Sequence, residues 1–324
     1  MYLLYVHVHH VKVVGVFPYI SRLGGQVQIF ERQKSSPCST SSNCETVYPT
    51  RIAESKDKVT IVLMGYERSR AKNYRKLFAR YLSMPETVDR VIFIWNNLEK
   101  PPPAVPEEVT LIRAEKNNMM NRYILAHGMS NRAVDALLTI DDDVLLDENL
   151  LRCMLAEFRE NSDSIIGLDA RHVDTDNGNY MSKDAKLAGS ATVIIGKTML
   201  MHRKFHVLAS KADEALRNAA LKGAVCESCD DLVVSAIVSN YTKTGPVVLR
   251  SDVWPFVRYA LPAPGGVSNK PNWYGKKGRR STCLRWLMKH FDVDELFKPK
   301  KVQNELRCVA AKSAPVLRPW SLTS

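Results

Sequence analysis

The stretch LLTIDDDV at residues 137–144 decides the fold class of this chain. An apolar run with the length of a buried strand ends here in three consecutive carboxylates, Asp141 to Asp143. Like charges crowded at a strand end repel one another unless a positive group lies among them. Mn²⁺ and Mg²⁺ suit such oxygens and complete their coordination with water and substrate phosphates. Because open α/β sheets bind ligands at the carboxyl ends of strands, we predict a metal–diphosphate site and a nucleotide-activated substrate.

A second interpretation of these acids needs no metal. Acids after a strand can form a solvated turn and the N-cap of the next helix. The apolar spacing from Leu150 to Phe158 predicts that helix, and Asp147 already supplies its cap. The three aspartates are then left without a structural role, which favours the metal interpretation.

The segments around this stretch alternate between strands and helices. Apolar runs predict strands at 59–64, 91–95, 109–113 and 136–140, and apolar residues at helical spacing predict a helix across 74–82. This alternation is typical of βαβ units and a parallel sheet, and hence of an α/β protein with a Rossmann-like nucleotide-binding layer. Neither GxGxxG nor GxxxxGK[ST] occurs, so a dinucleotide-dependent dehydrogenase and a P-loop NTPase are not supported.

The second half of the chain has a more mixed pattern. It predicts strands at 165–168 and 191–195, helices at 212–221 and 231–241, and a Gly/Pro/Asn-rich loop across 262–274. A loop of that length in a compact domain is typical of a lid or a disordered segment. The N-terminal region is different again. Residues 31–57 are rich in Ser, Thr, Lys and Pro, as in a linker or stem, and the apolar residues 1–20 are interrupted by histidines and a lysine.

These patterns predict three parts: a largely disordered leader and stem at 1–57, a domain at 58–300 and a tail at 301–324. Within the domain, 58–145 is expected to bind the nucleotide and 146–300 the second substrate. The net charge of +12 suits an anionic partner, but no basic stripe is interleaved with aromatics, so nucleic acid is not expected. Seven cysteines are too few for a disulfide scaffold and show no repeated zinc-ligand spacing. Cys226-x-x-Cys229 has no second pair, so neither a zinc site nor a thioredoxin-like redox role is expected there.

Polar side chains follow the predicted strands at the same edge of the sheet. Arg68 follows the first strand and Asn96 follows the second, and their planar groups suit a phosphate, a base edge or a ribose. Each alone is an ordinary turn or surface residue, and the shared edge is what favours binding. A further polar group, Asn117, Asn118, Asn121 and Arg122, is also suited to a base, ribose or phosphate. Asp231, by contrast, could simply cap its helix.

In order and spacing these motifs resemble the exostosin-like glycosyltransferase domain of glycosyltransferase family 64, from about residue 59 to about residue 298. The matching motifs are Met-Gly-Tyr66-Glu-Arg68, Ile94-Trp95-Asn96-Asn97, Asn117-x-x-x-Asn121-Arg122, Asp141-Asp142-Asp143, Ile165-Ile166-Gly167, Cys229-Asp230-Asp231 and Arg280-Ser281-Thr282-Cys283. The resemblance implies a GT-A fold, with a mixed sheet flanked by helices and merged with a smaller acceptor-binding half. It also implies a UDP-linked N-acetylhexosamine donor, GlcNAc or GalNAc, and transfer with retention of configuration.

The resemblance also implies roles for single residues. Asp143 is the implied ligand of Mn²⁺, with Mg²⁺ as the alternative. The residues implied to bind the donor are Arg68, Asn96, Asn117, Asn121, Arg122, Asp141, Asp142 and Arg280. Asp231 and Arg280 are the implied catalytic residues. Cys229 and Cys283 resemble a disulfide pair, which needs an oxidising compartment and agrees with the glycosylation sequon at Asn240.

The expected enzyme is therefore a hexosyltransferase of the Golgi or endoplasmic reticulum lumen that acts on a glycan or a glycosylinositol-lipid. Retention requires either a carboxylate nucleophile or front-face attack by the acceptor hydroxyl, and we favour front-face attack, with Asp231 orienting the acceptor. A nucleotidyltransferase and a catalytically silent glycan- or UDP-binding domain are the alternatives. The sequence leaves open membrane association, through the N-terminus or a partner, and homodimerisation.

Overall fold

The computed structural model describes residues 58–130, 133–184, 192–223, 227–249, 258–261, 277–291 and 301–303. The predicted stem, the predicted loop at 262–274, Cys226 and all but the first residues of the predicted tail lie outside these ranges. Among the residues that the structure describes, none of the helices combines the length and the apolar character needed to span a bilayer.

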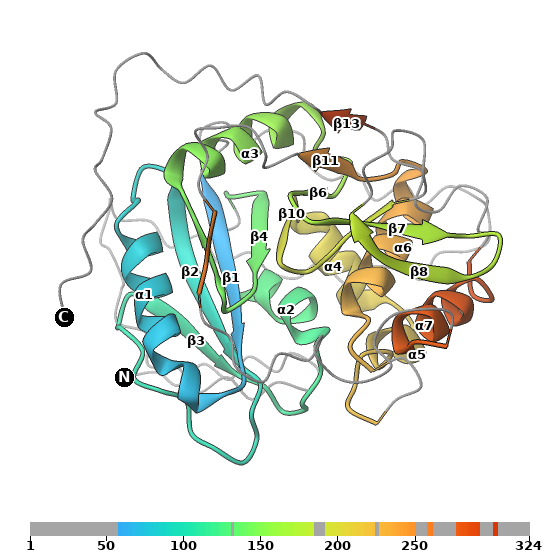
Figure 1. The fold of residues 1–324 in the computed structure, drawn as a ribbon. Helices are drawn as coiled ribbons and strands as arrows, with labels where there is room; N and C mark the ends of the chain where they lie inside the picture. Colours follow the sequence, from blue (N-terminus) through green and yellow to red (C-terminus); the bar gives the residue numbers. More distant parts are fainter. Residues whose placement is uncertain are drawn as a thin grey trace, which may run out of the picture. The chain divides into compact units, whose positions relative to one another are not determined.

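A mixed sheet of eight strands forms the centre of the fold, in the order β13-β11-β6-β10-β4-β1-β2-β3 (Figure 1). The strands are β1 (Val59–Gly65), β2 (Val88–Trp95), β3 (Val109–Arg113), β4 (Ala136–Ile140), β6 (Ile166–Gly167), β10 (Thr198–His202), β11 (Val247–Leu249) and β13 (Lys301–Gln303). The four strands of the first half, β3, β2, β1 and β4, pair in parallel, as predicted. β10 then runs antiparallel between β4 and β6.

The strand register places the predicted polar side chains at one edge. Gly65 at the end of β1 pairs with Trp95 at the end of β2, and Leu63 pairs with Ile140 at the end of β4. The residues that follow these strands therefore emerge together at the carboxyl edge of the sheet.

One face of the sheet is covered by α1 (Ala71–Leu82) and α3 (Glu148–Glu160). Because side chains alternate along a strand, Ile61 and Leu63 point to this face and pack with Tyr74 and Phe78 of α1 in one buried cluster. The N-cap of α3 is Asp147, whose side chain accepts from the backbone N–H of Asn149 at 2.8 Å, as predicted.

The strand side chains that point to the other face of the sheet belong to two further buried clusters. Val62, Ile92 and Ile94 pack against the region of α2 (Asn121–Ile124), and a larger cluster joins the sheet to the second half of the chain. That half contains α4 (Arg203–Lys211), α5 (Glu214–Arg217), α6 (Asp230–Thr242), α7 (Arg279–Leu287) and a small sheet of β7 (Ala170–Asp174), β8 (Asn179–Asp184) and β9 (Thr192–Ile194). A two-stranded sheet pairs β5 (Val144–Leu146) with β12 (Arg258–Ala260).

Two predictions for the second half were wrong in their extent. The helix predicted at 212–221 is the single turn α5, because Ala212 has extended backbone, with ψ of 161°, and separates α5 from α4. α4 itself was not predicted. The strand predicted at 165–168 is the two-residue β6, whereas 191–195 contains β9 and 231–241 lies within α6.

Candidate active site

The three aspartates form a turn that leaves the end of β4 and is held by backbone hydrogen bonds on both sides. The N–H of Asp141 donates to the carbonyl of Lys197 at 3.2 Å, and the carbonyl of Asp143 accepts from the N–H of Leu261 at 2.7 Å. Within the turn, the N–H of Val144 donates to the carbonyl of Asp141 at 3.2 Å. These hydrogen bonds fix the backbone from which the three carboxylates project.

Asp142 faces α1. Its carboxylate forms an ion pair with Arg70 and accepts from the hydroxyl of Tyr74 at 3.3 Å, while Asn73 contacts its backbone carbonyl at 3.4 Å. Burial raises the pKa of Asp142 to about 6, and this effect outweighs the guanidinium of Arg70, which lowers the pKa. Arg70, Asn73 and Tyr74 were not predicted as site residues. Arg70 ends the 3₁₀ turn before α1, and Asn73 and Tyr74 follow three and four residues later in the first turn of that helix, a spacing in the sequence that could have identified them.

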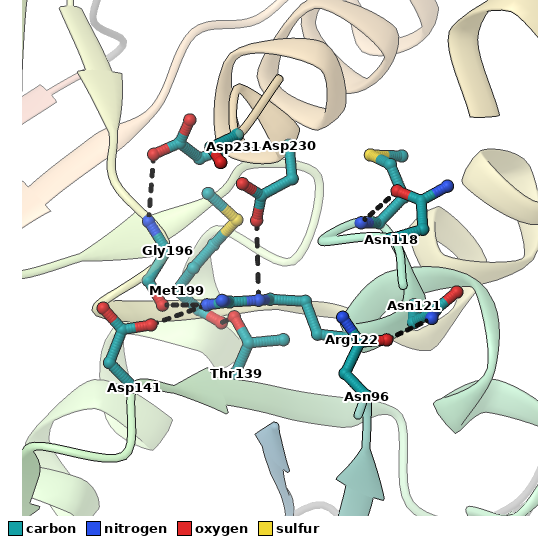
Figure 2. Close-up of polar contacts among 12 residues, drawn as sticks. Asn96, Asn118, Asn121, Arg122, Thr139, Asp141, Gly196, Met199, Asp230 and Asp231 are labelled. Carbon is teal, nitrogen blue, oxygen red and sulfur yellow. Dashed lines mark hydrogen bonds and ion pairs between the residues drawn. The ribbon is translucent and has the colours of Figure 1, made fainter. Parts of the chain in front are cut away.

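Arg122 joins the strand end to the start of α6 (Figure 2). One nitrogen lies 2.7 Å from Asp141 and 3.1 Å from the carbonyl of Gly196, and Nε lies 3.4 Å from Asp230. Arg122 is 5% exposed and Asp230 is 4% exposed. Burial raises the pKa of Asp230 to about 6, opposed by the guanidinium of Arg122. Asp230 was predicted only as part of a motif, and its ion pair with Arg122 is a product of the tertiary structure.

A second buried ion pair links Asp231 to Arg280, at 2.6 Å. The other Asp231 oxygen accepts from the N–H of Gly196 at 3.3 Å, as Figure 2 shows. Arg280 also donates to the carbonyl of Ser228 at 2.9 Å and lies 4.6 Å from the ring centre of Tyr180. Burial is the largest single effect on the pKa of Arg280 and lowers it, but Asp231, Tyr180 and Asp230 together raise the pKa above its ordinary value, so the guanidinium remains charged.

The disulfide between Cys229 and Cys283 is present and joins the N-cap of α6 to α7, with the Cα atoms 6.4 Å apart. Asp231 lies two residues after Cys229, and Arg280 lies three residues before Cys283. The bridge therefore fixes the two helix starts that carry the predicted catalytic pair. Cys153 in α3 is disulfide-bonded as well.

The asparagines form a separate network at the ends of β2 and α2. Asn121 donates to the side chain of Asn96 at 2.6 Å and to the carbonyl of Lys116 at 2.8 Å. Asn96 in turn donates to the side chain of Asn117 at 2.9 Å. Asn96 and Asn121 are buried, while Asn117 is half-buried, so the network presents Asn117 at its outer end.

Two predicted polar residues lie apart from these networks. Arg68 is exposed in the short 3₁₀ turn Arg68–Arg70, and the contact with the acids is made by Arg70 instead. Asn118 donates to the carbonyl of Arg217 at 2.8 Å and so connects the segment before α2 to the end of α5. Asn118 therefore has a structural contact, while Arg68 remains positioned near the edge.

A divalent cation at this strand end would need ligands beyond the protein, such as the oxygens of a diphosphate. Within the described ranges, no three acidic, histidine or cysteine side chains are gathered closely enough to hold a metal by themselves. Asp141 and Asp142 are already paired with arginines. Mn²⁺ and Mg²⁺, however, commonly take one or two protein carboxylates and complete their shell with water and phosphate oxygens. That ligand set is compatible with this strand end, and Asp143 is the ligand that we expect.

Comparison with known proteins matches residues 59–306 to the model of the glycosyl transferase family 64 domain. The chain is 24% identical to "Exostosin-like-3 homolog" of Caenorhabditis elegans over 268 residues, which is 78% of this chain and 31% of that protein. It is 18% identical to "Glycosyltransferase family protein 64 C3" of Arabidopsis thaliana, over 60% of this chain and 63% of that protein. With "Exostosin-1" of Pongo abelii the identity is 26%, over 49% and 21% of the two chains. The chain thus spans less than two thirds of each of these relatives.

The mixed α/β sheet, with acids and arginines at its carboxyl edge, is consistent with a GT-A-like α/β fold. The chain belongs to glycosyl transferase family 64. This agrees with the resemblance in the sequence motifs.

Proposed function

We propose that this protein is a retaining, Mn²⁺-dependent glycosyltransferase that moves an N-acetylhexosamine, GlcNAc or GalNAc, from its UDP donor to a glycan or glycolipid acceptor. One observation carries the proposal: Arg122 connects Asp141, at the end of β4, to Asp230, at the start of α6. This connection brings the Asp231–Arg280 pair to the same edge of the sheet as the strand-end acids. A nucleotide-sugar transferase needs both groups within reach of one donor.

The donor diphosphate would meet Asp143 and its cation at the strand end. When bound, the cation supplies Lewis-acid neutralisation of the charge that develops on the leaving diphosphate. Arg280 is positively charged and buried beside Asp231, so it can stabilise the same developing charge in a water-poor site. The Asn96–Asn121 network lies at the end of the neighbouring strand, where the uridine and ribose would bind.

Asp231 is the acid that would face the reacting carbon. Its two oxygens are engaged by Arg280 and by the N–H of Gly196, which hold the carboxylate in one orientation. A carboxylate paired in this way is a weakened nucleophile, because its charge is already shared with a guanidinium. This favours front-face attack, with Asp231 orienting the acceptor hydroxyl and stabilising positive charge on the sugar.

The lumen of the Golgi or endoplasmic reticulum is the compartment that we propose. The Cys229–Cys283 disulfide supports it, because disulfides persist in oxidising compartments. The net charge of +12 suits an anionic acceptor, an anionic membrane surface or the nucleotide sugar itself.

The test is UDP release by the full chain, purified with its disulfides oxidised, from UDP-GlcNAc and UDP-GalNAc in parallel. Each donor is assayed with Mn²⁺, with Mg²⁺ and with EDTA, with and without short glycan acceptors. We expect release that requires the metal and discriminates between the donors. Metal-dependent UDP binding without release from either donor would favour a silent binding domain, and release of diphosphate from a nucleoside triphosphate would favour a nucleotidyltransferase.

A further inference from the structure

The turn between β9 and β10 contacts every acid-bearing segment of the candidate site. The N–H of Gly196 donates to Asp231 at 3.3 Å, and the carbonyl of Gly196 accepts from Arg122 at 3.1 Å. One residue later, the carbonyl of Lys197 accepts from the N–H of Asp141 at 3.2 Å. Figure 2 shows Gly196 between Asp231 and Arg122. Three consecutive peptide groups therefore link the end of β4, the side chain from α2 and the start of α6.

There is no room for a side chain at Gly196. A Cβ atom there would lie 2.9 Å from Nη1 of Arg122 and 3.1 Å from the hydroxyl of Tyr123. Arg122 is held by Asp141 and Asp230, and Tyr123 is fully buried. A methyl group would therefore have to shift the guanidinium slightly relative to its two carboxylates, or move the turn away from Asp231.

We propose that Gly196 is a positioning residue of the transferase site, and this inference rests on the function proposed above. Because Gly196 has no side chain, its N–H can hold Asp231 while its carbonyl holds Arg122, so one turn sets the separation of the strand-end acids from the acid on α6. Gly196 acts through these two side chains and does not itself meet the substrate.

A methyl group at Gly196 and one at Gly167 would disturb different parts of the molecule. The atoms that would crowd a methyl at Gly196 are the ends of side chains, which can shift without unfolding the core. At Gly167 in β6, by contrast, a Cβ would lie 2.6 Å from the carbonyl oxygen of Thr198, which is backbone. A methyl at Gly196 should therefore change the site geometry at small expense in stability, whereas one at Gly167 should disturb the sheet.

The experiment compares Gly196→Ala with Gly128→Ala in the full chain. Gly128 is exposed, and a Cβ there meets nothing within 4 Å, so it is a matched control. We expect Gly196→Ala to lower kcat by about tenfold to a hundredfold, as misplacement of a reacting group by a fraction of an ångström to an ångström can do. Arg122 is an expected donor-binding residue that Gly196 contacts, so the donor KM should rise, but by less than kcat falls, because the Asn96–Asn121 network does not contact Gly196. The Tm should stay close to that of Gly128→Ala.

Equal kcat values for the two variants would overturn the proposal, and so would a loss of kcat explained by a large fall in Tm. Hydrogen–deuterium exchange provides a readout that does not need turnover. Gly196→Ala should speed exchange in peptides that contain Asp141 and Asp231, relative to Gly128→Ala. If the native chain has no transferase activity, the proposed function fails. The positioning inference fails separately if exchange at Asp141 and Asp231 is the same in both variants.

Discussion

Two buried arginines organise the site at the scale of single residues. Arg122 neutralises Asp141 and Asp230, and Arg280 neutralises Asp231. Removing one partner of a buried pair leaves an uncompensated charge, which typically costs about 3–5 kcal/mol. Truncating either arginine would therefore perturb folding and chemistry together. An isosteric change on the acid side also leaves a buried charge uncompensated, but it keeps the shape of the side chain, so its Tm is measured beside its turnover.

Asp231→Asn is that change. The amide keeps the shape of the carboxylate but removes its charge, so it can no longer stabilise positive charge at the sugar. We expect turnover to fall by about 10²–10³-fold, the range for loss of one preorganised electrostatic contact, with UDP affinity largely retained. UDP release and calorimetric UDP binding are the measurements. Asp174→Asn is the control, because Asp174 lies at the end of β7 in contact with Asn177. Turnover near that of the control would contradict the role of Asp231.

At the scale of elements, α6 carries the site and is enclosed by the core. Its first ten residues, Asp230 to Ser239, are buried, and it packs against α4 and α7. An α-helix that is apolar on all sides is stable only when enclosed in this way. The position of Asp231 therefore depends on the elements around α6, and the Cys229–Cys283 bridge is the covalent part of that support.

Replacing both Cys229 and Cys283 by Ser tests that support. The bridge closes a sequence separation of 54 residues, for which the loop-entropy model gives a stabilisation of about 4 kcal/mol. We expect the midpoint of denaturant unfolding to fall accordingly. Turnover should also fall at temperatures where the variant is folded, because the starts of α6 and α7 are no longer joined. Unchanged turnover in the folded variant would show that packing alone holds the Asp231–Arg280 pair.

The packing of α4 on α2 predicts a pH dependence of stability. His206 is fully buried, and Nδ1 lies 3.0 Å from the carbonyl oxygen of Tyr123. Burial is the largest effect on its pKa and lowers it to about 3, with His127 and His202 lowering it further. Below pH about 6.5 the unfolded chain binds a proton that the folded chain does not. The free energy of unfolding should therefore fall as the pH is lowered from about 6.5 toward 3.

The contribution of His206 to this slope is at most about 1.4 kcal/mol per pH unit. His206→Asn is the matched variant, because its amide can keep the donor to the carbonyl of Tyr123. Urea unfolding at pH 7, 6, 5 and 4 should show a shallower loss of stability in His206→Asn than in the native chain. The same slope in both proteins would show that other groups dominate in this range.

At the scale of the whole molecule, the site is assembled from segments far apart in the chain. Asp141 follows β4, Arg122 comes from α2, Gly196 lies between β9 and β10, and Arg280 lies on α7. The antiparallel strand β10 makes this possible, because it lies beside β4 and brings the turn before it to the acidic edge. The order of the strands in the sheet therefore brings the residues of the candidate site together.

We predict that the protein passes through the secretory pathway and is glycosylated there. Asn240 stands in the sequon Asn-Tyr-Thr near the end of α6, where the neighbouring Tyr241 is 60% exposed. Expressed in secretory cells, the chain should carry a glycan at Asn240 that peptide N-glycosidase removes with a visible shift in gel mobility. Asn240→Gln should abolish the shift, and Thr242→Ser, which keeps the sequon, should retain it. A chain that is secreted but unmodified would contradict this prediction.

Much of the first half of the fold could be predicted from the sequence, because the signals there are local. β3 and β4 coincide with the predicted strands, and Asp147 caps α3. The second half was less predictable because its elements are short. β6 has two residues and α5 has four, too few for a periodic pattern to develop. α4 was missed because its mixture of basic and apolar residues does not indicate where it begins.

The sequence by itself determined the class of fold, the acidic strand end and the family of the chain. These follow from strand alternation and motif order, which are readable over a few residues. Only the tertiary structure decided which charges meet: Arg70 with Asp142, Arg122 with Asp230 and Arg280 with Asp231. The physical reason is that these partners lie from about 50 to more than 100 residues apart, so strand order and helix packing select them, not any local propensity.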